Sequence, residues 1–297
     1  MQRHLFFLIF LLALTSLSYA EDKIRTNQIT YPTLWDSHDP ALQSGLEAVI
    51  KKQGLWKAIK KRQLSLVLVD ISNLSKPKLA ELNGNQMIYA ASLPKIAILL
   101  AAFVEIELGN LKETKALQEE ITKMIRYSNN QSASHVLSLV GEERVLEIIQ
   151  DPKFSLYDKR HNGGLWVGKA YAKGTAYKRD PIHNISHGAT GIQVARLYYL
   201  LETQQLLNQE YTIKMKETLS KPGIKHKFVK GLQSISGVEI YRKSGSWRNY
   251  HADSALVEYK EHKYILIGLS NSSSGGSWLV QVAKPIHELI TKVDKEL

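Results

Sequence analysis

Residues 89–100 read YAASLPKIAILL, so a short polar site is followed at once by an apolar run of helix-forming residues. Ser92 suits the N-terminus of a helix, and Pro94 suits the first turn, where the missing N–H costs little. Lys95 follows Ser92 by three residues, so both side chains project from one helix face. A hydroxyl beside an amine at the positively polarised end of a helix can become an activated nucleophile. The run from Ile96 to Phe103 is apolar throughout and predicts a helix buried on all sides.

The motif around Ser92, S-x-x-K, is too short to decide a function alone. A serine that only caps a core helix, with Lys95 reaching out to water, explains the same letters. Residues 75–78 also match the motif, but they stand in a polar turn with no helix behind them. The choice between nucleophile and cap therefore depends on the rest of the chain.

Two further motifs bear on that choice. Residues 128–130 read SNN, the only S-x-N of the chain, in the break between two expected helices. Residues 243–245 read KSG, the only K-[S/T]-G, at the end of an expected strand. Each has an ordinary explanation: Ser128 or Asn130 as a helix N-cap, and a strand that ends in a turn. In this order, however, the three motifs are those of penicillin-recognising serine enzymes.

With these motifs the chain resembles the penicillin-binding-protein and β-lactamase superfamily, and most closely the class A serine β-lactamases. The likeness covers nearly the whole chain after its first residues, although the stretch from Lys95 to Ser128 is shorter than in typical class A enzymes. The resemblance implies a serine hydrolase that works through an acyl-enzyme. Ser92 would attack a carbonyl carbon, Lys95 would be the general base, and Ser128 would relay a proton to the leaving nitrogen.

The same resemblance implies roles for the other motif residues. An unperturbed lysine is too basic to accept a proton at neutral pH, so Lys95 has to be desolvated or lie beside another cation, for which Lys243 is available. Asn130 would hold the substrate amide or the Lys95 amine, and backbone N–H groups of Ser92 and Ser246 would form the oxyanion hole. Lys243, Ser244 and Arg248 would bind a substrate carboxylate. Gly245 and Ser246 would be further substrate-binding residues. Arg248 is equally consistent with a plain surface role.

The expected deacylation base is missing. Class A enzymes hydrolyse the acyl-enzyme with a glutamate in an E-x-x-L-N motif, which this chain lacks. Residues 158–162 read DKRHN and keep the spacing from carboxylate to Asn, but with Asp for Glu and His for Leu. Asp158 is one methylene shorter than glutamate, so it is a candidate base with a different reach. Residues 163–168, GGLWVG, do not resemble a β-lactamase loop, so we expect deacylation to lag behind acylation.

Hydrophobic periodicity and turn residues predict the order helix, strands, helices, strands, helix. Helices are expected at 40–62, 92–108, 113–127, 131–140, 142–150, 192–207, 210–219 and 278–293. Strands are expected at 63–70, 86–89, 238–243, 252–259 and 263–270, with Asn83-Gly84 as a hairpin turn and 151–191 as a long loop. This order predicts an α+β fold of the β-lactamase and transpeptidase type. One antiparallel sheet, flanked by the terminal helices, would use about 21–88 and 224–297, with an all-helical lobe inserted at about 89–223.

The N-terminus has the pattern of a secretory signal. Arg3 and His4 precede an apolar run from Leu5 to Leu14, and residues 18–20 read SYA, with small residues where signal peptidase cuts. We expect residues 1–20 to be removed and the mature chain to begin at Glu21 in a secreted or periplasmic location. A retained membrane anchor is the alternative. The chain has no cysteine, which excludes a disulfide scaffold, a thiol nucleophile and a lipid-modified cysteine.

Charge and composition limit the partners. The formal net charge of +11 favours contact with anionic polymers such as the cell wall. Export and the lack of a concentrated Lys/Arg stripe argue against nucleic acid. We expect a monomer that acts on a small molecule or peptide, a β-lactam or a cell-wall D-alanyl peptide, without a cofactor. The non-enzymatic alternative is a receptor that is acylated or occupied by such ligands.

The histidines do not predict a metal site. His183 and His187 have the i, i+4 spacing of a helix, but Gly188 and the loop context argue against one, and no acidic third ligand is evident. We expect hydrogen-bonding roles for them and no metal. His251 and Asp253 lie just past Ser246, and the sequence assigns them no role.

Overall fold

The structure is a computed structural model that describes residues 30–172 and 174–291. The expected signal peptide at 1–20 lies outside the described residues. Among those residues, no helix has both the length and the apolar character needed to cross a membrane.

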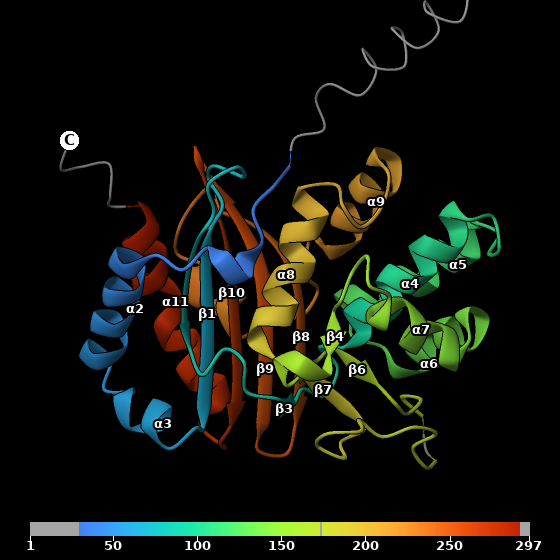
Figure 1. Ribbon diagram of the computed structural model, residues 1–297, viewed down its shortest axis with the longest axis horizontal. Coiled ribbons are helices and arrows are strands. Elements are labelled where there is room, and N and C mark those ends of the chain that lie inside the picture. The colour runs from blue at the N-terminus through green and yellow to red at the C-terminus, as the bar shows by residue number, and fades with distance from the viewer. Residues whose placement is uncertain (1–29, 173, 292–297) are drawn as a thin grey trace, which may run out of the picture.

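A five-stranded antiparallel sheet forms the centre of the molecule (Figure 1), with the strand order β2-β1-β10-β9-β8. Its strands are β1 (Leu64–Asp70), β2 (Lys78–Leu82), β8 (Glu239–Trp247), β9 (Tyr250–Tyr259) and β10 (His262–Asn271). Strand β1 pairs with β10, so segments from both ends of the chain lie side by side in one sheet. The prediction of an α+β fold with such a sheet is confirmed.

Helices cover both faces of this sheet. The first and last long helices, α2 (Pro40–Lys52) and α11 (Gly275–Thr291), pack on one face, and α8 (Gly191–Glu202) packs on the other. Strand β1 is therefore buried on both sides. Its alternate residues Leu66 and Leu68 join the core under α2 and α11, whereas Val67 and Val69 join the core on the opposite face.

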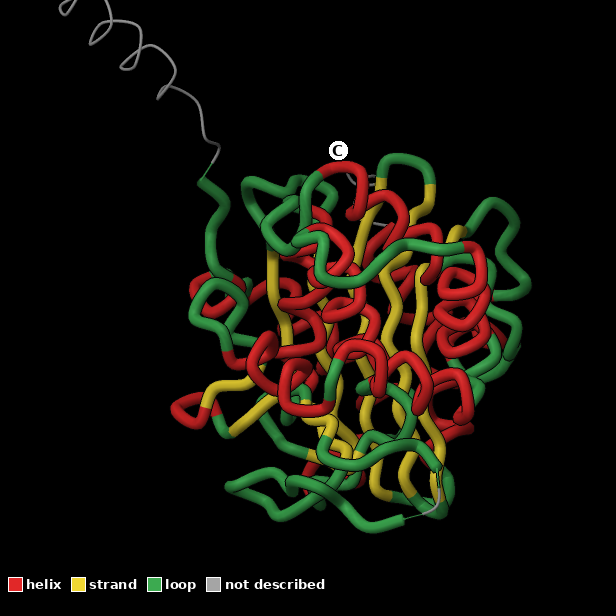
Figure 2. The backbone as a smooth tube through the Cα atoms, turned by 90° about the vertical axis from the view of Figure 1, so that its right-hand side faces the viewer, coloured by secondary structure: helices red, strands yellow, loops and turns green. Residues whose placement is uncertain are grey.

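The remaining helices form a helical lobe beside the sheet, which faces the viewer in Figure 2. It consists of α4 (Lys95–Glu107), α5 (Lys115–Arg126), α6 (Asn130–Val140), α7 (Glu142–Gln150) and α9 (Gln209–Leu219). Helix α4 packs against the other four. Residues 96–103 are fully buried, as their unbroken apolar character predicts.

Several boundaries differ from prediction for local reasons. The expected helix 40–62 is two helices, α2 and α3 (Trp56–Lys60), because Gly54 between them has φ +72. Strand β2 is not predicted, since its sequence KLAEL carries two charges in five residues. Strand β8 continues through Ser244–Trp247, beyond the expected end at 243. Short helical turns complete the chain as η1 (Leu34–Asp36), η2 (Lys159–His161) and α10 (Phe228–Leu232).

The predicted hairpin at Asn83-Gly84 is wrong. Strand β3 (Ile88–Tyr89) leaves the main sheet and pairs with β7 (His187–Ala189), a hundred residues later in the chain. The Asn83 side chain instead donates to the carbonyl oxygens of Ile59 and Leu64 at 2.9 and 3.0 Å, which redirects the chain.

The expected long loop at 151–191 contains short strands. They are β4 (Tyr157–Asp158), β5 (Gly163–Gly164), β6 (Trp166–Val167) and β7. Strands β3, β7 and β6 form a small sheet next to the start of α4, and β4 pairs with β5. Two-residue strands are too short to leave a periodic pattern in sequence, which is why this segment was expected to be loop throughout.

Candidate active site

Ser92 lies in a tight turn between β3 and α4. The Leu93 N–H donates to the Ala90 carbonyl at 3.0 Å, and α4 begins only at Lys95, three residues later than expected. Pro94 occupies the N-cap position, and no side chain caps the helix there. The capping explanation for Ser92 therefore does not hold, and its side chain remains partly exposed at the surface of the turn.

Lys95 is fully buried, and its amine is turned toward the SNN segment. Its Nζ donates to the Ser128 carbonyl at 2.7 Å, to Asn130 Oδ1 at 2.8 Å and to the Asn129 carbonyl at 3.3 Å. Burial lowers the pKa of Lys95 to about 7. The amine can therefore exchange a proton near neutral pH, although in this structure it is not hydrogen-bonded to Ser92.

The SNN segment has the local geometry that this contact needs. Asn129, not Ser128 or Asn130 as expected, is the N-cap of α6, and its side chain accepts from the Ser132 N–H at 2.8 Å. Ser128 has φ +58, a left-handed conformation that turns the chain sharply before the helix. The Ser128 and Asn130 side chains are thereby left for contacts with Lys243 and Lys95.

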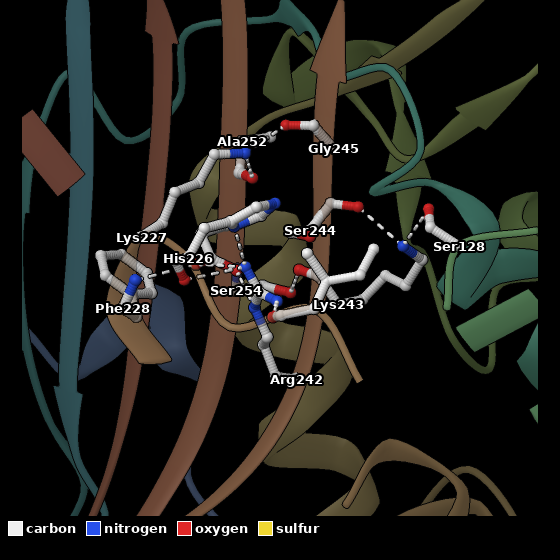
Figure 3. Close-up of polar contacts among 12 residues, drawn as sticks. Ser128, His226, Lys227, Phe228, Arg242, Lys243, Ser244, Gly245, Ala252 and Ser254 are labelled. Atoms are coloured by element: carbon white, nitrogen blue, oxygen red, sulfur yellow. Dashed lines mark hydrogen bonds and ion pairs between the residues drawn. The ribbon is translucent and has the colours of Figure 1, made fainter. Parts of the chain in front are cut away.

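Lys243 joins the sheet to the helical lobe (Figure 3). It projects from β8, and its Nζ donates to Ser128 Oγ at 2.9 Å and to the Ser244 carbonyl at 2.7 Å. Burial, and then the positive charge of Lys95, hold the pKa of Lys243 well below its ordinary value. The three motifs thus meet: Lys95 contacts the backbone of Ser128, and Lys243 contacts its hydroxyl.

Gly245 brings β8 against the nucleophile turn. A β-carbon at this position would overlap the Ala90 carbonyl oxygen and would lie 2.7 Å from the Ser92 nitrogen. Only glycine permits so close an approach of strand and turn. An oxyanion hole made from the N–H groups of Ser92 and Ser246 requires this convergence.

Lys227 is a site residue that the sequence did not reveal. Its Nζ donates to Ser246 Oγ at 2.8 Å and to the carbonyl oxygens of Gly245 and Ala252 at 2.6 and 2.9 Å. Burial lowers the pKa of Lys227 to about 8. It comes from the turn before α10, where no motif distinguishes it from other lysines.

Arg242 and Asp253 stabilise the region where the start of α10 meets β8 and β9. They form a buried ion pair, with Nε–Oδ1 at 2.7 Å and Nη2–Oδ2 at 3.0 Å, and Asp253 also accepts from the Phe228 N–H at 3.1 Å. Asp253, which the sequence left unassigned, therefore ties the start of α10 to β8 and β9. His251 and Lys227 line a cavity of about 640 Å³, and residues of α11 form its other side.

Two residues that the sequence suggests for the site, Arg248 and Asp158, make no contact with Lys95, Ser128 or Lys243. Arg248 is exposed at the tip of the β8–β9 hairpin, and its guanidinium lies 5.8 Å from the centroid of the Trp247 ring. Asp158 caps η2 and binds Arg160 and His161. The Arg160 contact is the main cause that lowers the pKa of Asp158 to about 2. A carboxylate this acidic, and held in this way, is a poor base.

The histidines have hydrogen-bonding partners. His183 Nε2 lies 3.0 Å from Asn162 Oδ1, and His187 Nε2 lies 2.9 Å from the Lys169 carbonyl. Within residues 30–172 and 174–291, no group of three or more His, Cys, Asp or Glu residues could hold a metal ion.

Comparisons with known proteins identify a family and a fold. A family model described as the Beta-lactamase enzyme family matches residues 113–296. A β-lactamase from Sphaerobacter thermophilus is 15% identical, with a TM-score of 0.66 over 84% of this chain and 98% of that one. PBP-A is also 15% identical, with a TM-score of 0.65 over 89% of this chain and 100% of that one. The extended-spectrum β-lactamase TLA-3 is 14% identical, with a TM-score of 0.64 over 86% of this chain and 99% of that one. No curated protein matches the chain.

Proposed function

This chain belongs to the β-lactamase enzyme family, and on that premise we propose that it is an exported serine hydrolase with slow deacylation. Its substrates would be β-lactams or cell-wall D-alanyl peptides, which form an acyl-enzyme at Ser92. One observation carries the proposal: Lys95, Ser128 and Lys243 are in contact beside the Ser92 turn. This arrangement supplies a nucleophile, a base of suitable proton affinity and a path for the proton to the leaving group.

Acylation would begin with proton transfer from Ser92 to Lys95. The Lys95 N–H donates to the Ser92 carbonyl at 3.3 Å, so the two residues share one turn of the backbone, and the Lys95 pKa of about 7 suits a general base at neutral pH. The amine has to leave one of its acceptors in the SNN segment and turn toward Ser92. The N–H groups of Ser92 and Ser246 would then stabilise the oxyanion.

The leaving nitrogen would receive its proton from Ser128. A serine hydroxyl has one hydrogen and two acceptor sites. Because Lys243 Nζ donates to Ser128 Oγ, the hydroxyl hydrogen is available for a different partner. Lys243, whose Nζ lies 2.9 Å from Ser128 Oγ, is close enough to return a proton to it afterwards.

The substrate carboxylate would bind beside the end of β8. Lys243 and Lys227 are buried amines, cationic when protonated, and their hydrogen-bond acceptors there are neutral oxygens. A buried cation without a directly bound carboxylate favours an anionic ligand. We propose Lys227 as an addition to Ser244, Gly245 and Ser246 in this region, with Arg248 at the rim.

Deacylation would be slow because neither Asp158 nor a hydrogen-bond partner of Lys95 offers a suitable carboxylate base. The hydrogen-bond partners of Lys95 are neutral oxygens, and Asp158 is bound to Arg160. Loss of a general base typically costs about 10²- to 10⁴-fold in rate. This favours an acyl-enzyme that lasts for minutes or longer. The same feature favours the second candidate, a non-turnover receptor for penicillin or muropeptides.

Intact-protein mass spectrometry after mixing with a penicillin tests this proposal. We expect one added ligand mass that persists, and no addition in Ser92→Ala. The chain offers a matched control in its second S-x-x-K at 75–78, so Ser75→Ala should retain the adduct.

Other outcomes decide between the alternatives. Slow turnover of a chromogenic β-lactam or a D-alanyl peptide would favour the enzyme, and a permanent adduct would favour the receptor. Rapid hydrolysis without an adduct would contradict slow deacylation, and Asp158→Asn would be the next variant to examine. If neither an adduct nor hydrolysis occurs, the proposed substrate class is wrong.

A further inference from the structure

Four rings form an aromatic wall along one side of the nucleophile turn: Tyr250, Tyr89, His187 and Tyr171. The ring centroids of Tyr250 and Tyr89 are 5.2 Å apart, those of Tyr89 and His187 are 6.1 Å apart, and those of His187 and Tyr171 are 4.4 Å apart. The rings come from β9, β3, β7 and the segment between β6 and β7, respectively. This aromatic wall ends at Lys95, whose Nζ lies 4.5 Å from the centroid of the Tyr171 ring.

Tyr171 contacts both Lys95 and the turn that carries Ser92. Its ring covers the Lys95 amine, and its hydroxyl donates to the carbonyl of Ala91, the residue before Ser92, at 3.3 Å. Burial raises the pKa of the Tyr171 hydroxyl well above its ordinary value, so the phenol stays neutral. The side chain therefore acts on Lys95 through its ring and not through a phenolate charge.

The groups around Lys95 determine whether its amine is neutral or protonated, and the Tyr171 ring is one of them. From β8, Lys243 presents a second amine, and burial together with the charge of Lys95 holds the pKa of this amine well below its ordinary value. From β7, His187 packs against the Tyr171 ring, and burial lowers the pKa of His187 to about 4, which keeps it neutral at neutral pH. The hydrogen-bond partners of Lys95 are neutral oxygens of the SNN segment. Burial thus favours the neutral amine, and no carboxylate among these partners opposes it.

We propose that Tyr171 is a positioning residue for Lys95: the face of its ring stabilises the ammonium form and holds the amine beside the Ser92 turn. The negative face of an aromatic ring attracts a cation, and this attraction is stronger when the pair is desolvated. Burial therefore lowers the pKa of Lys95, and the ring raises it. Their balance keeps its proton affinity in the range that a general base needs at neutral pH.

The direct test is a titration of Lys95 by NMR of its ¹³Cε, with the signal assigned from its loss in Lys95→Arg. Tyr171→Phe keeps the ring, so the pKa of Lys95 should match that of the wild type. Tyr171→Leu keeps an apolar side chain without the ring face, and should lower the pKa by about one unit, the shift expected for a desolvated cation–π contact.

A second series avoids changes in packing or folding. Phenylalanines with increasing fluorination at position 171 keep the shape of the ring while they remove its negative face. The pKa of Lys95 should fall stepwise along this series. A pKa that is unchanged along the series, or equal in the wild type, Tyr171→Phe and Tyr171→Leu, would overturn the assignment.

The kinetic consequence rests on the proposed function, but the titration does not. If Lys95 is the general base, the acidic limb of the acylation rate should move to lower pH in Tyr171→Leu by the same amount as the NMR pKa. If the wild type shows no acylation, the proposed function fails while the titration still decides the role of Tyr171. If acylation occurs and its pH profile does not follow the NMR pKa of Lys95 in Tyr171→Leu, Lys95 is not the general base of the proposed function, and the titration alone decides the role of Tyr171.

Discussion

Lys95 is a long cationic side chain that the fold has removed from water. Its exposed fraction is 0%, and burial lowers its pKa from an ordinary value of 10.5 to about 7. Burial therefore costs stability as long as the group is protonated, and that cost has to be offset by the rest of the core. The proposed role as general base depends on this lowered pKa, because a lysine with an ordinary pKa would keep its proton at neutral pH and could not accept another.

This residue should make the stability of the protein depend on pH. Between about pH 7 and 10.5 the unfolded chain keeps the Lys95 proton and the folded chain has lost it. The unfolded state then binds more protons, so the free energy of unfolding rises with pH, by about 1.4 kcal/mol per pH unit from this group. Below pH 7 both states are protonated and the contribution is constant.

Urea unfolding at pH 7.5 and pH 9.5 measures this effect as a difference between wild type and Lys95→Met. The substitution keeps an apolar side chain of similar length and removes the titration, so the wild type should gain more stability over this range than the variant. Equal gains in the two proteins would show that the amine keeps an ordinary proton affinity.

At the scale of elements, the site depends on how closely strand β8 approaches the turn before α4. The absence of a side chain at Gly245 sets that approach, since a β-carbon there would meet Ala90 and Ser92. The end of β8 is also held from its other side by Lys227 and the Arg242–Asp253 pair. The strand is thus fixed from both sides, as a preorganised oxyanion hole requires.

Gly245→Ala should separate the strand from the turn. Overpacking of this kind costs about 1–3 kcal/mol, and a displaced N–H donor costs about 10²- to 10³-fold in rate. The measurement is the rate of adduct formation with a penicillin together with the free energy of unfolding.

The matched control is Gly237→Ala, just before β8. Gly237 has open space around it but φ +82, so alanine there should lower stability by about 1 kcal/mol and leave acylation unchanged. If Gly245→Ala acylates as fast as Gly237→Ala, the close approach of strand and turn does not matter for catalysis.

At the scale of the whole molecule, the site lies between two bodies that different parts of the chain build. The sheet combines β1 and β2 with β8, β9 and β10, while the SNN segment comes from the helical lobe (Figure 1). The contact from Lys243 to Ser128 spans 115 positions of sequence. The groups that we propose to react are therefore assembled only in the complete fold, and a fragment of the chain should not be acylated.

The proposed export also concerns the whole molecule. Full-length chain produced in an exporting bacterial host should yield a mature protein that begins at Glu21, since the SYA sequence at 18–20 marks the cleavage site. Intact mass and N-terminal sequencing of the periplasmic or secreted protein measure this. A product that retains residues 1–20 and stays with the membrane would favour the anchor instead.

Local sequence alone predicts most of the order of elements, the burial of α4 and the place of Ser92 and the SNN segment before a helix, but not that the KSG motif lies inside β8. These features depend on neighbours within a few residues, and hydrophobic periodicity and turn residues record such neighbours directly. It also indicated the family through the three motifs in order. It failed for the two-residue strands of 151–191 and for the hairpin at Asn83-Gly84, where pairing partners lie far along the chain.

The contacts between side chains far apart in sequence depend on the three-dimensional fold. It turns Lys95 toward the SNN segment, sets Lys227 against Ser246, lays Tyr171 over the Lys95 amine and ties Asp158 to Arg160. Most of these contacts join residues whose spacing in sequence has no helical or strand period, so the sequence carries no local sign of them. They arise because the sheet, the helical lobe and the small sheet of β3, β7 and β6 pack around one turn, and packing is a property of the whole chain.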